Sequence, residues 1–174
     1  MDEDQSINQR LLQEALISYK EEYEEYSDLW HKLDSKAQAT ISISGIFLAA
    51  IFAFIRILSE SAACTEKYFL SGSIILLSFT VLCGLGVLWI KSVPCAPYGT
   101  AIKEFFDDLL ESDQEITPDD IDAFTKDKID LWENTNNDTY KVITTKGRIL
   151  LLAHVFLVLA ILLVSILTII KIWY

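Results

Sequence analysis

The chain has 174 residues, of which 52% are hydrophobic and 22% are charged, and its formal net charge is −11. Residues 39–58, 69–90 and 149–170 form three apolar stretches in which Arg56 is the only charged residue. A helix rises about 1.5 Å per residue, so each stretch can cross the roughly 30 Å hydrocarbon core of a bilayer. These stretches argue against a soluble domain. The acidic surface argues against nonspecific nucleic-acid binding, which depends on basic residues.

Residues 1–38 predict one long acidic helix in the cytoplasm. They hold ten acidic and four basic residues, and no Pro or Gly interrupts the chain between Met1 and Ser44. A secretory signal peptide is not expected, because acidic residues precede the first apolar stretch. Apolar and aromatic residues recur at spacings of three and four, which is the period of a heptad seam. The seam residues are Leu16, Tyr19, Tyr23, Tyr26, Trp30 and Leu33.

The same spacing extends the seam into the first span, where it passes through Thr40, Ser44, Phe47, Ile51 and Phe54. Two interpretations are open, because such a face packs either against symmetry-related copies in a wide bundle or against the chain's own helices. If copies surround an axis, Thr40 and Ser44 form the polar entrance of a pore. Phe47, Ile51 and Phe54 then form a hydrophobic gate below it.

The remainder of the chain predicts two further spans and a helical cytoplasmic insert. Residues 98–111 have the apolar pattern of a helix, and Thr117-Pro118-Asp119-Asp120 has the composition of a helix start, with Thr117 as the N-cap. That second helix is expected to continue into the third span. The expected order is a first span at 39–58, an outer loop at 59–68, a second span at 69–90, the insert at 91–148 and a third span at 149–170.

The distribution of Lys and Arg predicts the orientation of the spans. Eleven of these residues lie in segments 1–38 and 91–148, and only three lie on the opposite side. By the positive-inside tendency, the N-terminus and the insert are cytoplasmic and the C-terminus is outside. The expected fold is therefore all-α, with three transmembrane helices.

Few residues in the chain could support catalysis. Phosphate-binding loops and the common hydrolase and zinc-protease motifs are absent, so we expect no enzymatic activity, no cofactor and no metal site. His154 lies in the third span, where it either marks a pathway or bonds to a backbone carbonyl. Small residues at Gly45, Ala49 and Ala53 are spaced by four, which allows close helix packing within one subunit or between copies.

The entry to the first span reads Leu33-Asp34-Ser35-Lys36-Ala37-Gln38-Ala39-Thr40-Ile41-Ser42-Ile43-Ser44-Gly45. With its Asp34, Lys36, Ala37 and Gly45, this segment resembles the corresponding segment of the Pycsar-type membrane effectors of bacterial antiphage defence. The order of spans and insert is also similar to that of the membrane effector of the Hailong system. The long acidic N-terminal helix departs from the shortest Pycsar-type members.

The resemblance implies a homo-oligomeric effector, with a tetramer as the preferred stoichiometry, in the inner membrane of a bacterium. It implies an ion channel or membrane-disrupting protein that causes abortive infection. Its signal would be an anionic nucleotide or oligonucleotide made by a partner nucleotidyltransferase or cyclase. A basic collar of Lys32, Lys36, Lys146 and Arg148 is expected to bind that signal, although the same residues could serve only as interfacial anchors. The alternative function is a non-conducting anchor or sensory subunit that recruits a cytoplasmic partner.

Overall fold

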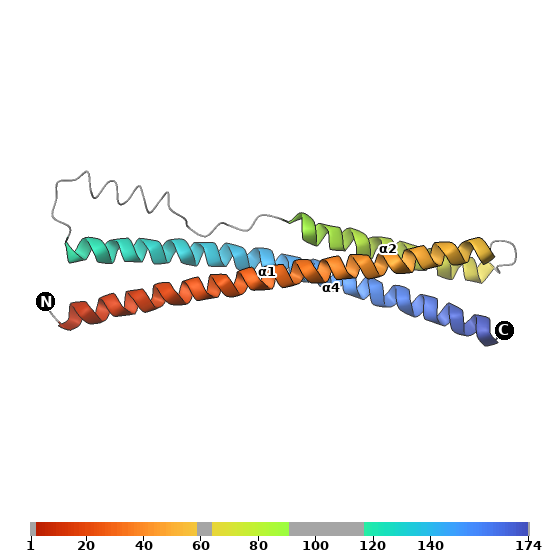
Figure 1. Ribbon diagram of the computed structural model, residues 1–174, viewed down its shortest axis with the longest axis horizontal. Helices are drawn as coiled ribbons and strands as arrows, with labels where there is room; N and C mark the ends of the chain where they lie inside the picture. The colour runs from red at the N-terminus through yellow and green to blue at the C-terminus, as the bar shows by residue number, and fades with distance from the viewer. Residues whose placement is uncertain (1–2, 59–63, 91–116, 174) are drawn as a thin grey trace. The chain divides into compact units, whose positions relative to one another are not determined.

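The computed structural model describes residues 3–58, 64–90 and 117–173. Their elements are three long helices, α1 (Glu3–Leu58), α2 (Cys64–Trp89) and α4 (Pro118–Trp173) (Figure 1). Within these ranges no strand occurs, which confirms the all-α expectation. The helix expected at residues 98–111 lies outside the described residues. All three described helices contain a segment that is long and apolar enough to cross a membrane.

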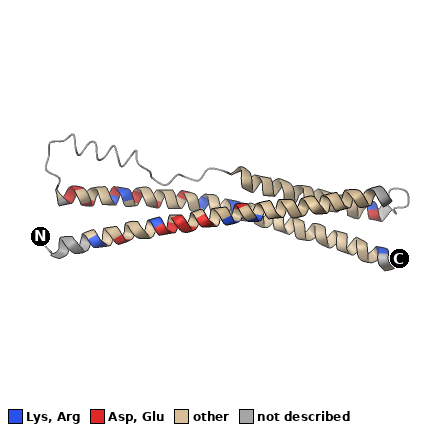
Figure 2. Cartoon of the chain, in the orientation of Figure 1, with Lys and Arg blue, Asp and Glu red and all other residues tan. Residues whose placement is uncertain are grey.

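Helix α1 is unbroken over 56 residues, as the absence of Pro and Gly before Gly45 predicts. The aromatic seam and the first span therefore belong to one helix. Figure 2 shows that the charged residues of α1 lie in its N-terminal part and that its C-terminal part carries few. This division follows the boundary at residue 38 that the composition predicts.

Helix α4 begins where the sequence predicts and is also unbroken over 56 residues. The Asp120 backbone N–H donates to the Thr117 hydroxyl at 3.4 Å, and the Asp120 carboxylate accepts from the Thr117 backbone N–H at 2.9 Å. This reciprocal pair satisfies two N–H groups that a helix start leaves without partners. The Thr117 bonds hold the pKa of Asp120 below its usual value. The predicted N-cap at Thr117 is confirmed.

Helix α2 begins at Cys64, inside the segment 59–68 that the sequence analysis assigns to an outer loop. Apolar composition marks only the part of a helix that lies in hydrocarbon, so it gives no signal for the polar first turn. Glu66 lies in that turn, where a negative charge is favoured by the helix dipole.

The described residues form two compact units, to which both α1 and α4 contribute. Residues 3–29 of α1 and 117–143 of α4 form the first unit, here called the helical pair. Residues 30–58 of α1, 64–90, and 144–173 of α4 form the second, here called the three-helix unit. The three-helix unit contains the apolar segments of all three helices.

The core of the three-helix unit is a line of apolar side chains contributed by all three helices. Ile51 of α1 lies in one cluster with Leu70 of α2 and Leu167 of α4. Ala37 of α1 lies in a second cluster with Val87 of α2 and Leu150 of α4. Since the order of positions is the same in α1 and α4 and reversed in α2, α1 and α4 run parallel and α2 runs antiparallel to both.

Candidate functional site

A buried lysine joins α1 to α4 at the start of the three-helix unit. The Lys146 side chain is 1% exposed, and its Nζ atom lies 2.7 Å from Asp34 Oδ1. The same Nζ atom lies 3.3 Å from the centroid of the Trp30 ring, which itself is buried. An isolated buried ammonium would be costly, so the carboxylate and the aromatic ring together make its burial possible. We call Trp30, Asp34 and Lys146 the junction cluster.

The other members of the predicted basic collar are arranged differently. Lys32, Lys36 and Arg148 are exposed, whereas Lys146 is enclosed by the junction cluster. Lys32 and Lys36 lie one helical turn apart on the surface of α1. Among the described residues, no ion pair or side-chain hydrogen bond joins either lysine to Arg148. Three of the four predicted ligand-binding side chains are therefore accessible, and the fourth is held by Asp34.

The predicted pore face lies against the chain's own helices. Thr40 is 2% exposed, Ser44 is fully buried and Ile51 is 4% exposed. Phe47 is half-buried against the core, and Phe54 is 48% exposed. Of the two interpretations of this face, the structure shows packing within one chain. Lining of a pore between copies remains a prediction.

The buried hydroxyl groups of this face bond to their own helix. Thr40 Oγ1 donates to the Lys36 carbonyl at 2.8 Å, and Ser44 Oγ donates to the Thr40 carbonyl at 2.8 Å. In α2, Ser73 and Thr80 are buried and bond in the same way to the carbonyl four residues earlier. Such bonds satisfy hydroxyl groups that have no water available to them. These residues need no polar partner on a neighbouring helix.

His154 lies on the surface of the three-helix unit beside Thr40. A carbonyl oxygen can only accept, so His154 Nδ1 carries a proton and donates to the Leu150 carbonyl at 2.8 Å. Its Nε2 atom lies 3.4 Å from Thr40 Oγ1. This geometry matches the structural interpretation, in which the histidine bonds to a backbone carbonyl near the end of the span. A role in a pathway remains untested.

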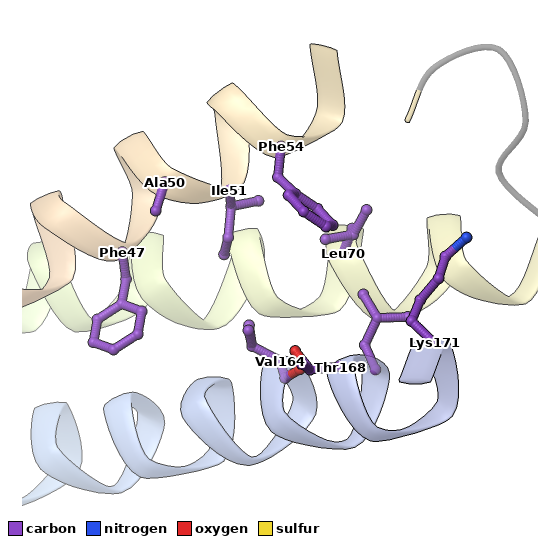
Figure 3. A pocket seen from close by; sticks show the side chains of 9 residues that line it. Phe47, Ala50, Ile51, Phe54, Leu70, Val164, Thr168 and Lys171 are labelled. Atoms are coloured by element: carbon purple, nitrogen blue, oxygen red, sulfur yellow. The ribbon is translucent and has the colours of Figure 1, made fainter. Parts of the chain in front are cut away.

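The three-helix unit contains an apolar cavity of about 430 Å³ between α1 and α4, at the end nearest the C-terminus. Figure 3 shows Phe47, Ile51 and Phe54 of α1 pointing toward Val164 and Thr168 of α4. Leu70 of α2 forms the floor, and Lys171 lies at one end. Lys171 Nζ lies 2.9 Å from Glu66 Oε1 of α2. Three of the lining residues belong to the gate predicted from the sequence, whereas Glu66 and Lys171 are not among the predicted site residues.

The small residues of the spans fall into two groups. A Cβ atom added at Gly84 of α2 would lie 2.6 Å from Ile41 Cγ1, so this glycine permits close contact between α1 and α2. A Cβ atom at Gly45 would meet nothing within 4 Å. Ala49 and Ala53, which follow Gly45 at intervals of four, are also exposed. We call Gly45, Ala49 and Ala53 the small-residue stripe; it takes no part in packing within the three-helix unit.

In the helical pair, the aromatic seam of α1 packs against α4. The rings of Tyr23 and Trp132 are 5.4 Å apart at an interplanar angle of 71°, and those of Tyr26 and Tyr140 are 6.0 Å apart. The Asn136 side-chain amide donates to the Tyr19 carbonyl and to Glu22 Oε2, both at 2.9 Å. The seam thus contacts the insert of the same chain, which is one of its two predicted partners. Asn136 was not identified from the sequence, because nothing in the sequence distinguishes it from the many other polar residues.

Comparison with known proteins adds no relative, because no protein-family model, curated protein or solved structure matches the chain. The similarity to Pycsar-type effectors therefore depends on residues 33–45 and on the order of the spans. Within the described part of the chain, no group of three or more His, Cys, Asp or Glu side chains is placed to bind a metal ion.

Proposed function

We propose that this chain is a membrane effector of a bacterial antiphage defence system. In this proposal several copies assemble in the inner membrane and permeabilise it when an anionic nucleotide or oligonucleotide binds. A nucleotidyltransferase or cyclase would supply the signal. The observation that carries the proposal is the contact between Asp34 and Lys146. Asp34 belongs to the segment that resembles the effectors, and its partner stands just before the third span.

The junction cluster suggests how such an effector is kept silent. Lys146 holds α4 to α1 at the entrance of the three-helix unit, and Thr40 and Ser44 are buried a short distance along α1. In the proposed mechanism the described arrangement is the resting state. Separation of α1 from α4 exposes the hydroxyl groups of Thr40 and Ser44 and wets the apolar face that follows them.

Two exposed features support ligand binding and assembly. Lys32, Lys36 and Arg148 are accessible cations in a chain whose net charge is −11, and they suit an anionic signal. The small-residue stripe faces outward, and such stripes let helices of neighbouring subunits approach closely in a membrane. A tetramer is the preferred assembly.

The proposal is tested by ion flux from liposomes that contain the purified protein. Asp34→Ala should raise the resting flux because it frees Lys146, while Asp28→Asn, which changes an exposed acid of α1, should not. Cyclic mononucleotides and short oligonucleotides should raise the flux of the wild-type protein. Lys36→Ala should weaken that response. A folded Asp34→Ala protein that conducts no more than wild type, with no nucleotide effective, would reject the proposal.

The helical pair favours the second candidate function, a non-conducting anchor for a cytoplasmic partner. Leu11, Ile17 and Ile121 are 59%, 54% and 49% exposed in this unit. These exposed apolar side chains are consistent with a surface completed by another protein. An anchor would bind its partner through Ile17 and Ile121 and would conduct no ions in the flux experiment.

A further inference from the structure

The cavity between α1 and α4 is open at its rim and closed at its floor. Ala50, Phe54 and Thr168 are exposed around the rim, so the cavity opens to the side of the three-helix unit (Figure 3). At the floor, Leu70 is 6% exposed and Ile51 is 4% exposed, although both line the cavity. Little of the floor is therefore accessible, so an occupant reaches it only with a thin part such as a chain of methylene groups.

A helix does not suit this space. With its side chains, a helix is about 10–12 Å across, and a floor able to receive one would expose its lining residues widely. The cavity volume of about 430 Å³ instead lies in the range of roughly 300–1,000 Å³ typical of small-ligand sites. A neighbouring subunit could cover the rim, but its backbone could not reach Ile51 or Leu70.

The lining also excludes water as the natural occupant. A water molecule needs two to four polar partners, and apolar cavities of this kind remain dry. An empty cavity leaves its lining without contacts, at a cost that grows with volume. In a bilayer the material next to the rim is hydrocarbon, so an acyl chain can fill the space without leaving its own environment.

One end of the cavity carries a lysine that is paired with a carboxylate. Lys171 lies in the last turn of α4, two residues before the exposed Trp173, in the composition typical of a membrane–water interface. The Lys171 side chain is 38% exposed, and one of its three N–H groups is directed to Glu66 Oε1 at 2.9 Å. Glu66 thus positions the lysine at the mouth and leaves its other N–H groups available for a phosphate oxygen.

We infer that the cavity binds one acyl chain of a membrane phospholipid, with Lys171 bound to the phosphate of the headgroup. The lipid is recognised by the apolar slot and by the lysine at the interfacial end of that slot. The site is independent of conduction, since it would bind lipid equally well in a channel or in an anchor.

The test compares two tryptophan substitutions on the same helix. Ala50 lines the cavity, whereas Ile46 is 70% exposed and belongs neither to the cavity nor to the small-residue stripe. Wild-type protein purified in mild detergent should retain phospholipid at one copy per chain in native mass spectrometry, and Ile46→Trp should retain the same. Ala50→Trp should lose it. Lys171→Gln should weaken the binding of added phosphatidylglycerol roughly tenfold, as expected for loss of one hydrogen bond to a charged group.

Equal phospholipid content in Ala50→Trp and Ile46→Trp would overturn the assignment. Loss of self-association in Ala50→Trp with unchanged phospholipid would instead make the cavity a contact between copies.

A second measurement needs no substitution. Wild-type protein in phosphatidylglycerol vesicles that carry a photoactivatable diazirine in the acyl chain should be labelled at Ile51, Leu70 or Leu167, which surrounding lipid cannot reach. Labelling confined to outward-facing residues such as Ile46 and Ala49 would also overturn the assignment.

Discussion

The Nζ atom of Lys146 lies 2.7 Å from Asp34 Oδ1, and the two side chains differ sharply in exposure: 1% for the lysine and 28% for the aspartate. The Trp30 ring covers the same ammonium group at 3.3 Å. The lysine therefore has no access to water, whereas the aspartate retains some. Charge-assisted hydrogen bonds of this kind are about twice as strong as neutral ones. Because the two side chains differ in exposure, removal of one should change the free energy of unfolding more than removal of the other.

Asp34→Ala should destabilise the three-helix unit more than Lys146→Met does. The first substitution leaves a buried ammonium group without its counter-ion, which costs about 3–5 kcal/mol in buried pairs. The second leaves a carboxylate that water can reach, and the methionine fills most of the lysine's space. Thermal unfolding in mild detergent measures the difference. Similar losses for both variants would mean that Lys146 is hydrated in solution.

Gly84→Ala should destabilise the contact between α1 and α2. The added Cβ atom would lie 2.6 Å from Ile41 Cγ1 and 3.7 Å from the Ala37 carbonyl oxygen, so the side chain or the helix must shift. Overpacking of this kind costs about 1–3 kcal/mol. The matched control is Gly147→Ala, which meets nothing within 4 Å and should be neutral or stabilising by up to about 1 kcal/mol. The prediction is that Gly84→Ala has a lower melting temperature than Gly147→Ala, and the reverse order would contradict it.

Assembly should depend on the small-residue stripe. Gly45→Leu should shift the mass of the protein in mild detergent toward the monomer without lowering its melting temperature, because the stripe makes no contact within the chain. Gly147→Leu is the control, since it also points into open space but lies on α4. A wild-type protein that is already monomeric would remove the proposed assembly and, with it, a pore formed between copies.

Burial and the hydrogen bond from Tyr26 Oη to Glu22 Oε1, 2.7 Å long, raise the pKa of Tyr26 to about 12. Because the folded-state pKa lies above the unfolded value, this contribution to stability is full below pH 10 and is lost as the pH rises toward 12. A titration of tyrosinate absorbance should show a late step that Tyr26→Phe removes. Tyr68→Phe, which removes an exposed phenol, should leave that step in place.

The sequence predicted the helices well and their contacts poorly, for a physical reason. Hydropathy and the lack of Pro and Gly give the lengths of apolar helices, and N-cap chemistry located the start of α4 at Thr117. These are local signals. The pairing of Asp34 with Lys146 joins residues 112 positions apart, and no periodicity records it. Lys146 was a predicted ligand-binding residue, and Asp34 was only part of the segment that resembles the effectors. The sequence placed Lys146 in an exposed collar because a basic residue beside a span usually reaches water.

The face of α1 shows a second limit of periodicity. The spacing of Thr40, Ser44 and Ile51 correctly marks one contact surface, but the same pattern serves a neighbouring helix of the same chain or a neighbouring copy. In the single chain, Ser44 is buried, so this surface packs against the chain's own helices.

Ser44→Leu and Ser42→Leu form the sharpest test of this face. Both serines lie in α1, and each donates to the carbonyl four residues earlier, at 2.8 Å and 2.9 Å respectively. They differ in that Ser44 is fully buried, whereas Ser42 is exposed. A leucine at 44 must therefore displace the groups packed around it, at a cost of about 1–3 kcal/mol. A leucine at 42 meets lipid.

Ser44→Leu should accordingly lower the melting temperature and raise the resting ion flux from liposomes, because it favours the separated state of the proposed channel. Ser42→Leu should change neither. Ser44→Ala keeps the packing and removes only a bond within α1, so it should behave as wild type. A destabilised Ser44→Leu protein without added flux would confirm the packing and count against conduction along this face. Equal behaviour of Ser44→Leu and Ser42→Leu would show that the face is not packed within one chain.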